Sequence, residues 1–429
     1  MRIQVPKGTQ DILPGEVEKW HYVEEMMRKV AFQYGFQEIR TPLFEHTELF
    51  QRGIGTTTDV VEKEMYTFED KGERSLTLRP EGTAGAARAF IEHSYVARPQ
   101  PTKFYYIGPI FRYERPQAGR YRQHHQFGVE IFGSPQPIAD AEVIILALDL
   151  FSRLGLADLT VKLNNIGCPT CRQSYRQALI DYLTPASADL CADCRNRLTR
   201  NPLRVLDCKQ DTCQTIVANA PTITQHLCLG CLDHFGRVLD YLRAADVKYE
   251  VDPKIVRGLD YYTRTVFEIV YSGLGAQSTV CGGGRYDNLI KTVGGSDTPG
   301  VGFGMGIERL LLTLEKNGCY LPSESGPDLY IAAIGDEALE KAFAAMYDLR
   351  NAGVHVVTDL MGRSLKAQLK YADKIKARYV AVLGEAELAA GQVQLKQMDG
   401  GEDIVIALPN LADWIVEKLG FDANKEEVK

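Results

Sequence analysis

The chain has 429 residues, of which 45% are hydrophobic and 24% are charged. This balance indicates a folded protein with room for two or three domains and excludes a disordered or fibrous chain. The net charge of −7 argues against a uniformly basic nucleic-acid coat, so any contact with nucleic acid must come from local basic patches.

The N-terminal stretch MRIQVPKGTQDILPGEVEKW lacks a basic region followed by an apolar one, and no uncharged apolar run is long enough to span a bilayer. We therefore expect a cytoplasmic protein with no membrane partner. Ten cysteines in such a chain point to reduced thiols or metal ligands rather than to disulfides.

The predicted elements begin with an amphipathic helix over residues 16–34, followed by the extended stretch QEIRTPLFE, whose Pro42 is typical of an edge strand or an interface segment. Further strands are expected over residues 76–78, 103–114, 122–132, 263–271 and 300–304, the last leading into a helix over 307–314. Strands joined by hairpin-like loops predict an α+β fold, an antiparallel sheet with helices packed on one side.

A cysteine-rich stretch over residues 167–250 interrupts this sheet and is interpreted as an inserted module. After Pro322, the turn-forming stretch SESGPD predicts a linker, and the remaining chain alternates strands and helices. We expect a domain over residues 1–322, interrupted by the insertion at 167–250, and a small α/β domain over 327–424.

Polar side chains gather on one face of a predicted strand pair, in FYYIGPIFRYERPQAGRYRQHHQFGVEIFG. Alternation puts Arg112 and Glu114 on one face of the first strand, and Gln126 and Glu130 on one face of the second. A solvated outer sheet face is the ordinary alternative. The arginine-, proline- and glycine-containing loop between the strands favours a ligand rich in phosphate.

A second ligand-binding pattern is GVGFGMGIERLL, in which glycines lead up to the start of a helix. Glycines let a ligand approach the backbone closely, and Arg309 falls on the first turn of the helix. An arginine there is as often a surface residue, so its role depends on the other groups near it.

Together these segments resemble motifs 2 and 3 of the class II aminoacyl-tRNA synthetases, and the first helix with TPLFE resembles motif 1. RGLDYYTRTVFE and GGGRYD resemble the two signature motifs of histidyl-tRNA synthetases, and LRPEGTAG and KGTQDILP are also similar to that family. The resemblance implies ligation of L-histidine to tRNA(His) through a histidyl-adenylate, with ATP and Mg²⁺. The alternatives are a non-catalytic regulatory paralogue of ATP phosphoribosyltransferase and a class II synthetase for another amino acid.

The resemblance also implies roles for single residues. Arg112 and Arg257 would be catalytic, the first holding the α-phosphate and the substrate carboxylate and the second neutralising charge at the α-phosphate. Arg120 and Arg309 would hold the γ-phosphate end of ATP, and Glu114 would face the adenine amino group.

Histidine selection requires partners for both ring nitrogens of a neutral imidazole. By resemblance, Glu130 and Tyr262 would contact the ring, and the other histidine-binding residues are expected to be Glu81, Gly82, Thr83, Gln126, Tyr261 and Tyr286, with Arg112 and Arg257 shared with ATP. The tyrosines could equally be ordinary core residues.

His124 stands where the family usually has a phenylalanine that stacks on adenine. We hypothesise that the neutral imidazole stacks instead and that its protonation weakens ATP binding.

The insertion contains three CxxC pairs and one wider pair, formed by Cys168, Cys171, Cys191, Cys194, Cys208, Cys213, Cys228 and Cys231. CxxC is a common chelating turn for structural zinc, and eight thiolates match two tetrahedral sites. Buried thiols without metal are the alternative. The family does not require this metal, and the spacing leaves open how the cysteines pair.

Contacts with tRNA are expected from Arg115 and Gln117 in the motif 2 loop and from a basic helix face of the C-terminal domain, which resembles the family's anticodon-binding domain; that face carries Arg363, Lys366, Lys370 and Lys374. Arg195, Arg197, Arg200 and Arg204 in the insertion could contact the acceptor arm or be a solvated charge cluster. Motif 1 with Pro42 implies a homodimer.

Overall fold

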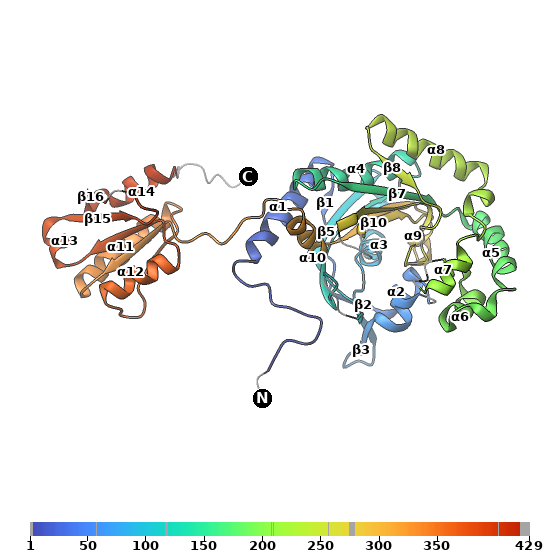
Figure 1. Ribbon diagram of the computed structural model, residues 1–429, viewed down its shortest axis with the longest axis horizontal. Coiled ribbons are helices and arrows are strands. Elements are labelled where there is room, and N and C mark those ends of the chain that lie inside the picture. Colours follow the sequence, from blue (N-terminus) through green and yellow to red (C-terminus); the bar gives the residue numbers. More distant parts are fainter. Residues whose placement is uncertain are drawn as a thin grey trace. The chain divides into compact units, whose positions relative to one another are not determined.

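The computed structural model describes residues 3–56, 58–115, 119–206, 208, 210–255, 257–273, 279–401 and 403–420. The chain divides into two compact units at the Pro322–Ser323 peptide (Figure 1). Each unit is described by itself. Within the described residues, no helix is both long and apolar enough to cross a membrane.

The first unit is built on an eight-stranded sheet in the order β1-β5-β6-β11-β10-β9-β7-β8. Its strands are β1 (Gln37–Glu38), β5 (Thr102–Phe111), β6 (Gln123–Phe132), β7 (Leu159–Asn165), β8 (Tyr249–Val251), β9 (Thr263–Tyr271), β10 (Thr279–Arg285) and β11 (Gly300–Gly306). The six inner strands pair antiparallel, as predicted, whereas β1 and β8 join the two edges in parallel.

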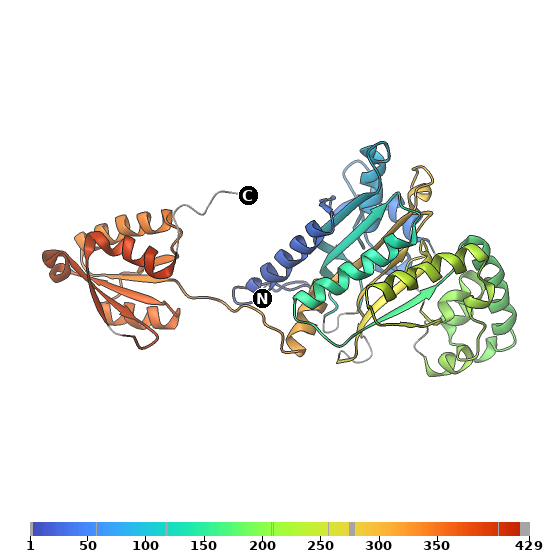
Figure 2. The same cartoon turned by 90° about the horizontal axis from the view of Figure 1, so that it is seen from above.

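One face of the sheet packs on helices α1 (Val17–Gln33), α4 (Pro137–Arg153), α8 (Leu229–Ala244) and α10 (Ile307–Lys316). Figure 2 shows α1, α4 and α8 side by side across this face. The periodic apolar residues that predicted the first helix, Trp20, Val23, Met27 and Val30, are all buried. Burial of this stripe holds α1 on the sheet.

The opposite face is partly covered too, so the prediction of helices on one side only was wrong. Helices α3 (Thr83–Glu92) and α9 (Leu289–Thr292) pack there over aromatic residues of β5 and β6. Nearby lie α2 (Thr47–Ile54) and a three-stranded sheet of β2 (Phe44–His46), β3 (Tyr66–Glu69) and β4 (Ser75–Leu78). On this face, β6 carries the polar side chains of Gln126 and Glu130.

The cysteine-rich stretch lies between β7 and β8. It forms α5 (Pro169–Leu183), α6 (Ala192–Arg200), α7 (Asp211–Val217) and α8, with short 3₁₀ turns between them. Val238 and Leu242 of α8 join the core of the sheet. The other three helices pack around two small separate apolar clusters.

The second unit has a five-stranded sheet in the order β13-β12-β14-β15-β16. Its elements are β12 (Leu329–Ala333), α11 (Asp336–Asn351), β13 (Val356–Thr358), α12 (Leu365–Lys374), β14 (Tyr379–Leu383), α13 (Glu385–Ala390), β15 (Gln392–Gln397), β16 (Ile404–Ala407) and α14 (Leu411–Leu419). Helices α11 and α14 pack on one face and α12 on the other, which is the small α/β domain that the alternating pattern predicted.

Candidate active site

The floor of the site is the open face of β6 and β11. Along β6, Phe127, Val129 and Ile131 are buried in the core, while Gln126 and Glu130 point to the opposite face, as the alternation predicted. On β11, Gly302 pairs with Glu130 and Gly304 with Gly128. A Cβ at Gly302 would overlap the Glu130 carboxylate, and one at Gly304 would overlap the Gln126 amide. The glycines therefore make room for polar side chains in mid-sheet.

A cleft of about 930 Å³ opens over this floor. The residues that line it include six of those expected to bind ATP or the reacting phosphate: Arg112, Glu114, Arg120, His124, Arg257 and Arg309. It is also lined by Glu268, Thr279 and Gly282 of β9 and β10, and by Leu206 and Gln214 of the insertion. Residues that are far apart in the sequence thus converge on one cleft.

Strand β5 ends at Phe111, so the prediction that it runs to Glu114 was wrong. Arg112 continues the hairpin by one backbone hydrogen bond, from its N–H to the Arg122 carbonyl at 2.8 Å. Its Nε donates to the Pro80 carbonyl at 2.7 Å, and its Nη1 lies 3.9 Å from Glu114. Glu114 also forms an ion pair with Arg120. Arg112 is therefore oriented by the loop before α3 as well as by its own hairpin.

Two further arginines reach the cleft from other elements. Arg309, on the first turn of α10, donates from Nη1 to the Thr279 carbonyl at 3.0 Å, and burial lowers its pKa. Arg257 forms an ion pair with Glu268 at 2.7 Å, and its buried Nε has no hydrogen-bond partner among the described residues. A Cβ at Gly282 would stand 2.6 Å from its Nη1. An unpaired buried guanidinium N–H is a ready donor for an anionic ligand.

Glu130 is fully buried behind the glycines. The hydroxyl of Tyr106 donates to its Oε1 at 3.0 Å, and that of Tyr286 donates to its Oε2. Burial raises the pKa of Glu130 to about 8. Tyr106 was missed by the sequence reasoning, although alternation along β5 from Gly108 would have placed it on this face.

The start of α3 supplies the next group of predicted residues. The Glu81 carboxylate accepts hydrogen bonds from the Thr83 and Ala84 amides, both at 2.7 Å, and burial raises its pKa. The Gly82 amide donates to Gln126 Oε1 at 3.3 Å. The LRPEGTAG segment is therefore joined directly to the floor by its backbone.

Three predicted tyrosines form the wall beside Glu130. The rings of Tyr261 and Tyr262 lie 4.6 Å apart, and those of Tyr261 and Tyr286 lie 5.5 Å apart at 73°. All three are at least nine-tenths buried and belong to one apolar cluster. They are therefore core residues, and one of them, Tyr286, also donates a hydrogen bond to the buried Glu130.

His124 lies in the cleft with a buried Nδ1 that has no hydrogen-bond partner within the described residues. Burial, followed by the charge of Arg112, lowers its pKa to about 3. A pKa this low keeps the ring neutral between pH 5.5 and 7.5. The hypothesis that protonation of His124 weakens ATP binding therefore applies only at a lower pH and stays a prediction.

The residues expected to contact tRNA are less concentrated. Arg115 is exposed, and Gln117 lies outside the described residues. Lys366, Lys370 and Lys374 are exposed on α12. Arg363 precedes α12, where its guanidinium pairs with Asp359 at 2.6 Å, so its placement on the helix was wrong.

The four arginines of the insertion that were expected to contact tRNA or solvent instead make contacts within the first unit. Arg197 pairs with Asp59 at 3.0 Å, Arg200 pairs with Glu62 at 2.7 Å, and Arg204 donates to the Gly258 carbonyl. Arg195 donates to backbone carbonyls of its own module, including that of Leu190. The interpretation as a solvated cluster or an acceptor-arm contact overlooked this bracing role, which a sequence pattern does not reveal.

The eight predicted metal-ligating cysteines come together as two groups of four, Cys168, Cys171, Cys228 and Cys231, and Cys191, Cys194, Cys208 and Cys213. All ten cysteines of the chain lie in described positions and are free thiols.

Comparison with known proteins relates both units to known families. One family model, described as histidyl-tRNA synthetase, matches residues 8–310, and a second, described as an anticodon-binding domain, matches residues 328–418. The histidine–tRNA ligase of Desulforamulus reducens is 54% identical over 410 residues, covering 96% of this chain and 98% of that protein. That of Caldanaerobacter subterraneus is 55% identical over 411 residues, with coverage of 96% and 99%.

Solved structures give the same result. Apo histidyl-tRNA synthetase of Staphylococcus aureus superposes with a TM-score of 0.83 at 39% identity, covering 96% of this chain and 100% of the other. A Bacillus halodurans protein titled ATP phosphoribosyltransferase regulatory subunit/histidyl-tRNA synthetase has a TM-score of 0.65 at 21% identity, covering 90% and 99%. This second likeness concerns the fold alone.

Proposed function

The chain belongs to the histidyl-tRNA synthetase family and attaches histidine to tRNA(His), and from this premise we propose how its own residues perform the reaction. Histidine and ATP bind side by side on the open sheet face. The histidine carboxylate attacks the α-phosphorus of ATP, which gives histidyl-adenylate and pyrophosphate. The 3′-hydroxyl of the terminal ribose of the tRNA then takes the histidyl group from the adenylate, and AMP is released. Positioning and charge neutralisation carry such a step, with no covalent enzyme intermediate.

Three arginines divide the phosphate chemistry. Arg112, held by the Pro80 carbonyl, binds the α-phosphate together with the histidine carboxylate. Arg257 offers its Nε, for which the described residues provide no hydrogen-bond partner, to the charge that develops at the α-phosphate. Arg309 binds the γ-phosphate end with Arg120. A guanidinium fixed in advance at a developing negative charge lowers the barrier without reorganisation of the site.

Glu114 accepts a hydrogen bond from the adenine amino group, and neutral His124 packs against the base. Mg²⁺ bound with ATP would find the oxygen donors that it prefers at Glu268, a carboxylate that lines the cleft. When bound there, the ion would supply charge neutralisation at the phosphates.

Histidine is recognised by the pocket around Glu130. Glu130 accepts the imidazole N–H and Tyr262 contacts the other ring nitrogen, while Tyr261 and Tyr286 form the walls. Glu81, Thr83 and Gln126 bind the α-amino group at the backbone of Gly82. A site built to satisfy two ring nitrogens strongly rejects amino acids that lack them, because its buried polar groups would be left unpaired.

A single observation carries the proposal: Arg112, Arg257 and Arg309, from three segments far apart in the chain, converge on one cleft, and Arg257 also lies 5.6 Å from the centre of the Tyr262 ring. ATP–pyrophosphate exchange measured with each of the twenty amino acids tests it. Exchange should depend on histidine alone. Exchange with another amino acid would reject the histidine pocket, and absence of exchange would favour a non-catalytic regulatory protein.

A homodimer is proposed through the motif 1 region. Leu43, Phe44 and Phe68 are large apolar residues left exposed there, and the rings of the last two lie 6.4 Å apart. Clusters of this kind mark association surfaces. Sedimentation velocity should give a dimer that Phe44→Glu converts to a monomer; a monomeric wild type would exclude it.

Contacts with tRNA are assigned to both units. Arg115 and Gln117 meet the acceptor end beside the cleft, and Lys366 and Lys370 with Arg363 contact backbone phosphates in the anticodon region. We assign the reaction to the cytoplasm, where tRNA is charged.

A further inference from the structure

The insertion between β7 and β8 contains two groups of thiols that the aminoacylation reaction does not use. In each group all four Sγ atoms lie within 4.8 Å of one another. Four thiolates at the corners of a tetrahedron around zinc stand about 3.8 Å apart, because the Zn–S bond is roughly 2.3 Å long. The Sγ atoms of Cys168 and Cys171 are 3.5 Å apart, and those of Cys191 and Cys208 are 3.9 Å apart. Each group therefore has the dimensions of a mononuclear site.

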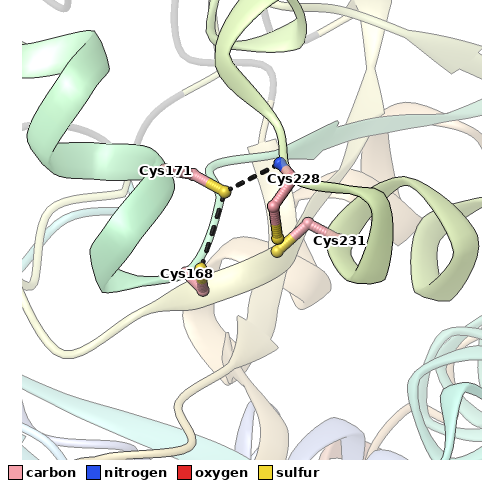
Figure 3. A group of neighbouring side chains, drawn as sticks. All are labelled: Cys168, Cys171, Cys228 and Cys231. Carbon is pink, nitrogen blue, oxygen red and sulfur yellow. Dashed lines mark hydrogen bonds between the residues drawn. The ribbon is translucent and has the colours of Figure 1, made fainter.

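We propose that this chain holds two structural Zn²⁺ ions, the first by Cys168, Cys171, Cys228 and Cys231 and the second by Cys191, Cys194, Cys208 and Cys213. The pairing is nested, because the outer two CxxC pairs make the first site and the pairs between them make the second. Figure 3 shows the four thiols of the first site, from the start of α5 and the start of α8, turned toward one another.

Backbone hydrogen bonds support thiolate character at both sites. The Cys228 amide donates to Cys171 Sγ at 3.1 Å (Figure 3), and the Cys191 amide donates to Cys213 Sγ at 3.3 Å. Amides that point at sulfur stabilise the charged ligand and orient it, as partners of metal ligands do elsewhere.

The donor set selects the metal. Four soft thiolates in a tetrahedron suit zinc or iron and exclude hard cations such as Mg²⁺. Four protein thiolates would occupy all four positions of a tetrahedral ion and leave none for substrate, which is typical of a structural centre. The close spacing of the sulfurs favours a single ion over a multi-iron cluster, whose ligands would be spread around several metal atoms.

The first site is joined to the histidine pocket. Arg172 follows Cys171 directly, and its Nη1 donates to the Tyr262 carbonyl at 2.9 Å. Asn165, at the end of β7, donates from Nδ2 to the Cys231 carbonyl at 2.8 Å. An ion that ties the start of α5 to the start of α8 therefore also steadies the segment carrying Tyr262. This consequence rests on the proposed function, whereas the metal sites do not.

Metal analysis of the purified full-length protein, under reducing conditions without added chelator, gives the first test. We expect two equivalents of zinc per chain and four sulfur neighbours in the zinc X-ray absorption spectrum, at about 2.3 Å. Zero or one equivalent, iron in place of zinc, or nitrogen or oxygen ligands would overturn the proposal. Cys281→Ala and Cys319→Ala, which change the two cysteines outside the groups, should retain two equivalents.

Two double variants test the pairing. Cys171→Ala with Cys231→Ala removes ligands from one proposed site and should leave one zinc, whereas Cys171→Ala with Cys194→Ala damages both and should leave none. Pairing of neighbouring cysteines in sequence order would reverse these results.

A measurement on wild type covers the case in which a variant does not fold. Partial removal of zinc by a chelator, followed by thiol alkylation and peptide mapping, should modify Cys168, Cys171, Cys228 and Cys231 together, or the other four together. Modified sets that mix the two groups would contradict the nested pairing. None of these measurements on the metal sites depends on aminoacylation. Failure of the metal sites and failure of the proposed reaction are therefore distinguishable.

Discussion

The central sheet of the first unit has a large core, which joins six inner strands to four helices. The insertion, by comparison, has only a small apolar interior. In the cluster that holds α6 and α7, three of the eight buried residues are cysteines, Cys194, Cys208 and Cys213. Interiors of this size bury too little apolar area to offset the conformational entropy of ordering the chain. We infer that the two regions are stabilised differently. In the sheet, packing and strand register position the polar floor. The insertion requires cross-links, which the proposed zinc ions supply.

The largest effect on the reaction rate is expected at the floor of the active site. Arg257→Gln should lower the rate of ATP–pyrophosphate exchange by about 10²–10³-fold, because it removes a positioned positive charge. The melting temperature should fall much less than the rate, because Glu268 of β9, which loses its ion pair with Arg257, still accepts a hydrogen bond from Thr279. Arg153→Gln, which removes a surface ion pair with Asp149, is the control and should exchange normally. Comparable rates for the two variants would remove Arg257 from the reaction.

The buried carboxyl of Glu130 gives a prediction about pH. Its pKa is about 8 in the folded protein and near 4.3 in an unfolded chain. Between these values the folded state binds the extra proton, so the free energy of unfolding should fall as pH rises, by up to roughly 1.4 kcal/mol per unit. Glu130→Gln should flatten this fall. Chemical denaturation from pH 5 to 8.5 measures it, and equal slopes in wild type and variant would show that Glu130 does not titrate there.

The glycines of β11 offer a matched pair. Gly302→Ala would place a methyl group against the Glu130 carboxylate and the Val129 carbonyl, and a backbone atom cannot move aside. We expect a loss of about 1–3 kcal/mol in stability and weaker histidine binding. In Gly304→Ala, the new methyl group would contact the end of the flexible Gln126 side chain, so the loss of stability should be smaller. Thermal melts and histidine KM report both, and a reversed order would contradict the described register.

Arg172 tests the contact between the two regions. Arg172→Gln removes the hydrogen bond to the Tyr262 carbonyl, and the histidine KM should rise by about fivefold, equivalent to roughly 1 kcal/mol. The zinc content should be unchanged. Arg176→Gln, on the next turn of α5, loses an exposed bond to Thr199 instead and serves as the control. Identical KM values for the two variants would show that the insertion does not steady the histidine pocket.

The smallest effect is expected at His124. Because its pKa is near 3, the ring stays neutral, and His124→Phe should keep the ATP KM within about twofold of wild type. The profile from pH 5.5 to 7.5 should be parallel for the two proteins. A wild-type KM that rises steeply below pH 6.5, and does not in the variant, would restore the protonation hypothesis.

Much of the floor could be predicted from the sequence because strand alternation is local. The period of two correctly assigned Gln126 and Glu130 to one face and Phe127 and Val129 to the other. It failed beyond Phe111, where the strand ends and Arg112 is oriented by the distant Pro80 carbonyl. Alternation does not report where a strand stops, nor which distant segment binds the next side chain.

The insertion shows the opposite balance. Three CxxC pairs and one wider pair predicted eight metal ligands. The nested pairing, however, depends on how the start of α8 returns to the start of α5 across more than fifty residues. The same return carries Arg197 and Arg200 to Asp59 and Glu62. Such contacts follow from the tertiary fold and have no local pattern in the chain.

Amide hydrogen exchange of the intact protein, before and after zinc is removed, tests most directly whether the two regions are held by different means. We expect α5, α6 and α7 to lose protection when the metal is removed, while β6 and β11 keep theirs, because the sheet has its own core. Unchanged protection in the three helices, or an equal loss in the two strands, would contradict the division between a floor held by packing and an insertion held by thiolate–metal bonds.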